Sequence, residues 1–187
     1  MEIKNVSKSY GAEQVLENVS FEINEGDAVV ISGPSGRGKT TLLRLMMGLE
    51  KPDSGEIIGT PEKIAAVFQE DRLPPEFTAL KCVRMTSPKS ASKAEIENRL
   101  TELGLGEHIN KPVSELSGGM KRRVAICRAV LGSSDAVYMD EPFTGLDYDT
   151  KVRVIEYVKK YCTGKTLVVV SHSSEDAELL GAKEIRI

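Results

Sequence analysis

A glycine-rich segment at residues 33–40 has the composition of a phosphate-binding loop. It reads Gly33-Pro34-Ser35-Gly36-Arg37-Gly38-Lys39-Thr40 and matches the pattern G-x-x-x-x-G-K-[ST]. Glycines let the backbone wrap around a phosphate with its N–H groups pointing inward, and a helix start adds partial positive charge. We therefore expect a bound nucleoside triphosphate, with Lys39 on the β- and γ-phosphates and the Thr40 hydroxyl on Mg²⁺. The loop alone does not distinguish a kinase, a GTPase and a motor.

Two adjacent carboxylates stand at the end of a short apolar run further along the chain. Ala136–Asp140 reads as a buried strand, and Glu141 follows it directly. Asp140 is placed to meet a magnesium ion held by Thr40. Glu141 would point to the other side, where a carboxylate can orient a water in line with the γ-phosphate and accept its proton. An acidic strand end is common by itself, but the upstream phosphate loop favours the metal and water site.

Two further polar residues follow predicted strands. Gln69 comes directly after the strand Lys63–Phe68, and His172 comes directly after the strand Thr166–Ser171. The Gln69 amide can bind Mg²⁺ or the attacking water. A histidine in a loop is most often an ordinary surface residue, but its place at the end of a core strand favours a γ-phosphate sensor.

A second anion site is predicted at a helix start near residue 117. Leu116-Ser117-Gly118-Gly119-Met120 precedes the amphipathic run Lys121–Leu131. Serine and glycines at a helix N-terminus attract anions, although a simple small-residue cap is an alternative interpretation. One chain cannot easily wrap both anion sites around one nucleotide, whereas two chains packed head to tail can. The sequence therefore predicts an isologous dimer that shares two nucleotides.

Strands alternating with helices must position these residues. Beyond the runs already given, Val19–Ile23 and Ala28–Ser32 read as strands and Lys39–Met47 as a helix. Continuous apolar strands are typical of a parallel sheet covered on both faces, so we predict an α/β fold with a parallel central sheet and right-handed crossovers.

One stretch of the chain departs from this pattern. Residues 70–116 contain Pro74, Pro75 and Pro88 and show no strand-like run, while Ser92–Glu95 forms a capping box before residues at helical spacing. We predict a single domain over residues 1–187, in which 1–69 and 117–187 form the nucleotide-binding core and 70–116 a small helical insertion.

Composition narrows the class of protein. The 187 residues suit one domain, and 40% hydrophobic residues suffice for a buried core. The 25 basic and 28 acidic residues give a net charge of −3, which argues against a protein that mainly grips nucleic acid. No apolar run approaches the roughly 20 residues that span a bilayer, and residues 1–5 lack a secretory signal's apolar stretch. Three widely spaced cysteines predict a reducing cytosol without a disulfide framework or zinc site.

Taken together, these residues resemble the nucleotide-binding subunits of ATP-binding cassette (ABC) transporters over nearly the whole chain. Met120 stands where glutamine is commoner in the family. The matching motifs keep the family's order: the adenine-stacking aromatic Tyr10, the Walker A loop Gly33–Thr40, the Q-loop glutamine Gln69, the signature motif Leu116–Met120, the Walker B strand Val137–Asp140, the catalytic glutamate Glu141, the D-loop Gly145–Asp147 and the switch histidine His172.

The resemblance implies a P-loop NTPase fold with an N-terminal antiparallel β part, and ATP and Mg²⁺ as cofactors. It implies that Thr40, Gln69 and Asp140 hold the metal, and that Glu141, His172, Gln69 and Lys39 are catalytic. The implied nucleotide contacts are Tyr10, Gly33, Pro34, Ser35, Gly36, Arg37, Gly38, Lys39, Thr40, Thr41, Ser117, Gly118, Gly119 and Asp147.

The same resemblance implies partners. They are a second copy of the chain, at least transiently with ATP, integral membrane permease subunits and, for an importer, a solute-binding protein. No nucleic acid partner is expected, and the protein would be cytoplasmic, on the inner face of the cell membrane. Residues 67–73, 116–120 and 138–143 look like the nitrate/sulfonate/taurine importer branch. Glu76 stands near Pro75 where that branch usually has an aromatic, a departure that concerns partner and solute rather than ATP hydrolysis.

The sequence also bears on three other classes of protein. A soluble ABC protein acting on DNA would carry long coiled coils between the phosphate loop and the signature, and none is present. Ribosome-associated members usually fuse two cassettes in one chain. The signature and the Asp140-Glu141 pair speak against a small kinase or GTPase. The basic cluster Lys121–Arg123 could indicate nucleic acid, but we favour a solvated helix face close to nucleotide phosphates.

Overall fold

A parallel sheet forms the centre of the protein, which is described by a computed structural model covering residues 1–187. The strand order is β5-β6-β7-β3-β8, and all neighbouring strands are parallel. β6 and β7 are buried along their whole length, which explains their continuous apolar sequences. The predicted α/β fold with a parallel central sheet is confirmed. The strands are β3 (Ala28–Ser32), β5 (Ile64–Val67), β6 (Ala136–Asp140), β7 (Thr166–Ser171) and β8 (Lys183–Arg186).

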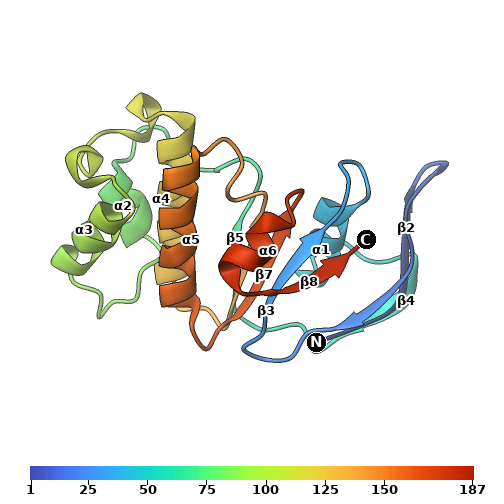
Figure 1. Ribbon diagram of the computed structural model, residues 1–187. Coiled ribbons are helices and arrows are strands. Elements are labelled where there is room, and N and C mark those ends of the chain that lie inside the picture. Colours follow the sequence, from blue (N-terminus) through green and yellow to red (C-terminus); the bar gives the residue numbers. More distant parts are fainter.

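A second, antiparallel sheet stands to one side of the first (Figure 1). Its order is β2-β1-β4, with β1 at Glu2–Tyr10, β2 at Glu13–Glu22 and β4 at Ser54–Ile58. This sheet confirms the N-terminal antiparallel β part that the resemblance implied, whereas the residue pattern by itself predicted only Val19–Ile23, at the end of β2, and neither β1 nor β4. These strands are exposed on one face, and their register shifts at bulges where Asn5 and Asn18 adopt positive φ. Bulges disturb the apolar alternation that identifies a strand.

The helices cover both faces of the central sheet. α1 (Lys39–Met46) lies between the two sheets, where Leu42 and Met46 pack with apolar residues of both (Figure 1). α4 (Gly118–Leu131) and α5 (Tyr148–Cys162) lie together against the opposite face. A shorter helix, α6 (Glu175–Leu180), joins β7 to β8. Alternate residues of the strands thus feed two separate apolar cores.

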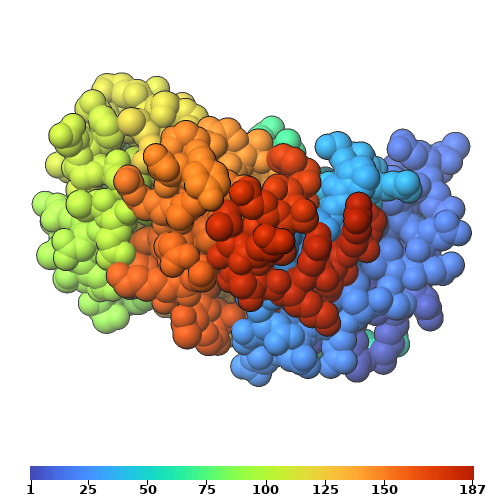
Figure 2. All heavy atoms as spheres, in the orientation of Figure 1, coloured from blue at the N-terminus to red at the C-terminus, as the bar shows by residue number.

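The segment between β5 and α4 contains helices and no strand. α2 spans Ala79–Arg84, α3 spans Lys93–Glu102, and two 3₁₀ turns follow at 106–108 and 113–115. It forms the rounded end of the molecule that is drawn in green (Figure 2). The Ser92 hydroxyl caps α3 by accepting a hydrogen bond of 3.1 Å from the Glu95 N–H. The Glu95 carboxylate pairs with Arg99, so the chain uses one half of a capping box.

None of the helices has the length and apolar character needed to cross a bilayer.

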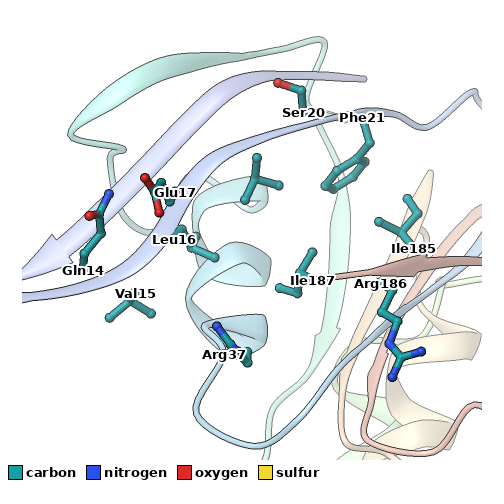
Figure 3. Close-up of a pocket in the computed structure, with 11 residues that line it drawn as sticks. Gln14, Val15, Leu16, Glu17, Ser20, Phe21, Arg37, Ile185, Arg186 and Ile187 are labelled. Atoms are coloured by element: carbon teal, nitrogen blue, oxygen red, sulfur yellow. The ribbon is translucent and has the colours of Figure 1, made fainter.

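A groove of about 480 Å³ runs between β2 and β8, the outer strands of the two sheets (Figure 3). Phe21 lines it from β2, and Ile185 and Ile187 line it from the end of the chain.

Replacement of Ser92 by alanine should lower the free energy of unfolding by about 1 kcal/mol, because the cap on α3 is lost. Urea denaturation measures this change. Ser114→Ala is the matched control, because Ser114 is exposed and its hydroxyl makes no hydrogen bond. Equal stability of the two variants would contradict a capping role.

Candidate nucleotide-binding site

Four predicted site segments meet at one edge of the central sheet. The phosphate loop follows β3, Gln69 follows β5, Glu141 follows β6 and His172 follows β7. The register pairs Ser32 with Ser171 and Asp140 with Val170, so these strands end at the same level. Because all four strands are parallel, their carboxyl ends share the edge where α/β proteins bind ligands.

The phosphate loop is held by left-handed glycines and by contact with β2. Gly36 and Gly38 have φ of 81° and 79°, and Gly38 is the N-cap of α1. A Cβ on Gly38 would lie within 2.8 Å of Val15 and Leu16, so only glycine lets the loop approach β2 this closely. The helix start is thereby presented to the cavity beside it.

Lys39 is buried and has no acidic partner. Its side chain folds back over the loop, where Nζ donates to the carbonyl oxygens of Gly33 at 2.7 Å and Pro34 at 2.9 Å. Its ammonium is therefore a buried positive charge held by neutral dipoles. A charge held in this way is free to neutralise an anion that enters the loop.

Thr40 and Asp140 bring two hard oxygen atoms together. The Thr40 hydroxyl donates to Asp140 Oδ1 at 3.2 Å, and only 3% of Asp140 is exposed. Burial raises the pKa of Asp140, and the bond from Thr40 partly offsets that effect. A buried carboxylate with a single hydroxyl donor has oxygen lone pairs to spare. This pair fits Mg²⁺, which needs few protein ligands when phosphates and waters supply the rest.

Glu141 and His172 form a second polar pair at the same edge. Glu141 adopts a φ of 50°, and its Oε2 lies 2.8 Å from His172 Nδ1 and accepts a 3.0 Å hydrogen bond from the Thr144 hydroxyl. A left-handed conformation is strained for glutamate and is typical of functional positions. The side chain of His172 is more than half exposed, whereas that of Glu141 is only 19% exposed. His172 also lines a neighbouring cavity together with Gly33 and Pro34.

A cavity of about 320 Å³ joins the phosphate loop to Glu141 and Gln69, whereas Asp140 and His172 line neighbouring cavities. Glu141 and Gln69 line it opposite the loop residues. Val15 of β2, which no sequence motif singled out, completes the wall. The loop residues that line it are Ser35, Gly36, Gly38, Lys39, Thr40 and Thr41.

Four of the nucleotide contacts implied on this side do not line the cavity: Gly33 and Pro34, which line the cavity beside His172, and Arg37 and Tyr10. Arg37 lines the groove between β2 and β8, beside Val15 (Figure 3). Tyr10 ends β1 with 46% of its surface exposed, and its hydroxyl donates to the Glu50 carboxylate. That hydrogen bond raises the pKa of Tyr10. Glu50 was not predicted because nothing in the sequence links it to a residue 40 positions away.

The second predicted anion site is not part of the chain's own cavity. Ser117 is the N-cap of α4, and its hydroxyl accepts a 3.3 Å hydrogen bond from the Met120 N–H. Asp147 is the N-cap of α5 and accepts from the Thr150 N–H at 3.0 Å. A Cβ on Gly119 would be 3.4 Å from Leu146, so the two helix starts adjoin each other. Ser117, Gly118, Gly119 and Asp147 therefore form a surface of their own.

The prediction that Lys121–Arg123 is a solvated helix face was wrong for both arginines. Arg122 donates to the Phe68 carbonyl oxygen at 2.6 Å. Arg123 donates to the carbonyl oxygens of Gly119 at 3.1 Å and Leu103 at 2.8 Å. The Phe68 and Leu103 carbonyls lie just beyond the ends of β5 and α3 and have no backbone partner, so the forked guanidinium supplies the donor that each one needs.

Asparagine in place of Asp140 should raise the unfolding free energy of the nucleotide-free protein at pH 7, by on the order of 1 kcal/mol. Because burial raises the pKa of this carboxyl in the folded state, its ionisation opposes folding above that pKa. The opposition fades as the pH falls towards the unfolded value near 4. Urea denaturation at pH 7 and pH 5 should therefore show a difference that narrows at pH 5. A less stable asparagine variant at pH 7 would contradict a destabilising ionised carboxyl at this position.

Comparison with known proteins places this site in a family. A family model described as ABC transporter matches residues 16–144. The aliphatic sulfonates import ATP-binding protein SsuB 2 of Pseudomonas syringae pv. syringae is 36% identical over 99% of this chain and 68% of its own length. The Nod factor export ATP-binding protein I of Rhizobium etli is 36% identical over 96% of this chain and 62% of its own length.

A solved structure agrees with these relatives. The dimeric post-hydrolysis state of the ATP-binding cassette MJ0796, bound to ADP and Pi, matches with a TM-score of 0.80 and 33% identity. The match covers 95% of this chain and 90% of that one. This similarity to an ABC cassette excludes the kinase and the GTPase, which the phosphate loop alone left open. The chain therefore belongs to the ABC transporter family, as an ATP-binding subunit that hydrolyses ATP.

Proposed function

We propose that this protein energises a membrane transporter by binding two MgATP molecules between two copies that pack head to tail. The observation that carries this proposal is the division of the site. The phosphate loop, Asp140 and Glu141 share one edge of the sheet, whereas the helix start at Ser117 lies on a separate surface of the same chain. A second copy can bring its Ser117 to this chain's nucleotide, and symmetry then builds the second site.

Each side of the cavity has a proposed role towards ATP. The ammonium of Lys39 exchanges the carbonyls of Gly33 and Pro34 for the β- and γ-phosphates. The loop amides and the start of α1 hold the remaining phosphate oxygens. Tyr10, freed from Glu50, stacks on the adenine, and Ser117, Gly119 and Asp147 act from the partner copy.

Mg²⁺ would be held by Thr40, Asp140 and Gln69 and would supply charge neutralisation between the β- and γ-phosphates. The Thr40–Asp140 hydrogen bond already places two of these oxygens within 3.2 Å of each other. Gln69 lines both cavities that adjoin Thr40, so its amide oxygen would be available as a third hard ligand.

Glu141 is the proposed general base. A water attacks the γ-phosphorus, the bond to the β-phosphate oxygen breaks, and Glu141 takes the proton of the water. His172 holds the Glu141 carboxylate at 2.8 Å and reaches towards the γ-phosphate side of the loop. Loss of the γ-phosphate removes the contacts that join the two copies, so hydrolysis opens the dimer.

The helical segment 70–116 is the proposed contact with the membrane subunits. The segment follows Gln69 directly in the chain. A movement of Gln69 on ATP binding or hydrolysis would therefore be passed straight to the helical segment. Met85 at the end of α2 is 63% exposed, which offers an apolar contact to a partner. We propose that the protein works at the inner face of the cell membrane and serves an importer of a small sulfonate-like anion, with a solute-binding protein delivering the solute.

A soluble ABC protein acting on DNA or the ribosome is the alternative. The chain has one cassette and no long helical extension between β5 and α4. The importer assignment is supported by the similarity to the sulfonate import protein, whereas the equally similar Nod factor export protein favours an exporter.

Glu141→Gln should reduce ATP hydrolysis at least about 100-fold, because the amide cannot accept the proton of the water. ATP binding should persist, and the variant should elute as a dimer with ATP in gel filtration. Glu156→Gln is the control, because Glu156 is exposed on α5 and pairs only with Lys159. Hydrolysis at the normal rate by Glu141→Gln would exclude the proposed base.

The Glu141→Gln variant should also retain the membrane partner. Tagged protein would be recovered from detergent-solubilised native membranes with and without MgATP, and the bound proteins identified by mass spectrometry. An integral membrane protein in stoichiometric amount is expected, and a solute-binding protein in the same complex identifies an importer. Recovery of only ribosomal or DNA-bound proteins would favour the soluble alternative while leaving the ATPase assignment intact.

A further inference from the structure

Arg122 of α4 holds the backbone on both sides of Gln69. Its guanidinium donates to the Phe68 carbonyl oxygen at 2.6 Å and to the Gln69 carbonyl oxygen, and it pairs with the Asp71 carboxylate at 3.2 Å. Only 12% of the Arg122 side chain is exposed. Residues 68–71 lie beyond the end of β5, so a sheet partner does not hold these carbonyls.

A second arginine on the same helix extends this contact. Arg128 donates to the Arg72 carbonyl oxygen at 3.2 Å and to the Asp71 carbonyl oxygen at 3.4 Å. The segment that carries Gln69 is therefore attached to α4 at residues 68, 69, 71 and 72. A displacement of α4 would therefore be passed to the backbone of this segment through four carbonyl contacts.

The same helix begins with the residues proposed to contact the partner's nucleotide. Ser117 caps α4 and Arg122 lies five positions later, roughly 7.5 Å along the axis at 1.5 Å per residue. The Lys121 N–H donates to the Ser117 carbonyl oxygen at 2.9 Å, which ties the start of α4 to the turn that carries Arg122. Docking of Ser117 on one nucleotide would therefore shift the backbone of Gln69 at the other.

We propose that Arg122 is a positioning residue that couples the two nucleotide sites by setting Gln69 according to the position of α4. This inference rests on the proposed function, because it requires Gln69 to act at the nucleotide and Ser117 to act on the partner. Arginine suits the role because its planar fork reaches two carbonyls and a carboxylate at once, which the single ammonium of lysine does not.

The test compares Arg122→Met, Arg122→Lys and the control Lys183→Met in the full chain. Lys183 is exposed on β8 and makes no hydrogen bond or ion pair, so its variant removes the same charge away from the segment that carries Gln69. Arg122→Met should lower kcat about tenfold and lower the Hill coefficient for ATP towards one, with KM changed less than about twofold. Lys183→Met should match the unaltered protein.

Arg122→Lys separates positioning from stability. Lysine retains the pair with Asp71, so its melting temperature should stay close to that of the unaltered protein, while kcat stays several-fold lower. If Arg122→Lys restored kcat together with the melting temperature, Arg122 would be merely structural and the proposal would fall.

A double-mutant cycle with Gln69→Ala identifies the route of the effect. Arg122→Met should change kcat less than about twofold in the Gln69→Ala background, because both changes act on one step. Multiplicative losses would overturn the coupling through Gln69 and leave the proposed function standing. Normal hydrolysis by Gln69→Ala alone would overturn the proposed role of Gln69 and this inference with it.

Discussion

The parallel alignment of β3, β5, β6 and β7 is the constraint on which the candidate site depends. Parallel neighbours end at one edge, so residues from four distant parts of the chain meet there without any long loop. β3, β6 and β7 are buried on both faces, and the two apolar cores against which they pack hold the edge in place. Burial of the charged groups of Lys39 and Asp140 costs free energy, and this edge keeps both side chains buried in spite of that cost.

Those two charges are held in different ways, and the difference suits one ligand. Lys39 is surrounded by carbonyl dipoles, while the carboxylate of Asp140 receives a single hydroxyl hydrogen bond. A phosphate satisfies the first and a divalent cation the second. A nucleotide carrying its metal would satisfy both together, which accounts physically for an incomplete hydrogen-bond network in the ligand-free site.

α4 occupies a special place in this arrangement. Its capped start at Ser117 lies outside the chain's own cavity. Further along the helix, Arg122 and Arg128 donate hydrogen bonds to backbone carbonyls of residues 68–72, the segment that carries Gln69. Its apolar face packs in the larger core together with α2 and α3. One helix thereby links the surface proposed for the second copy, the nucleotide edge and the helical segment proposed for the membrane partner.

Local sequence determined the phosphate loop and the cap of α3 at Ser92, because each depends on a short motif of neighbouring residues. It also determined the strands β3, β6 and β7, because burial on both faces requires a continuous apolar run. It also determined the family, since the motifs stand in a fixed order. Only the tertiary structure decided that Tyr10 binds Glu50, that Val15 walls the cavity and that Arg122 turns from solvent to the backbone beside Gln69. These contacts join residues far apart in the chain, and a long polar side chain takes its partner from whatever the fold leaves unpaired.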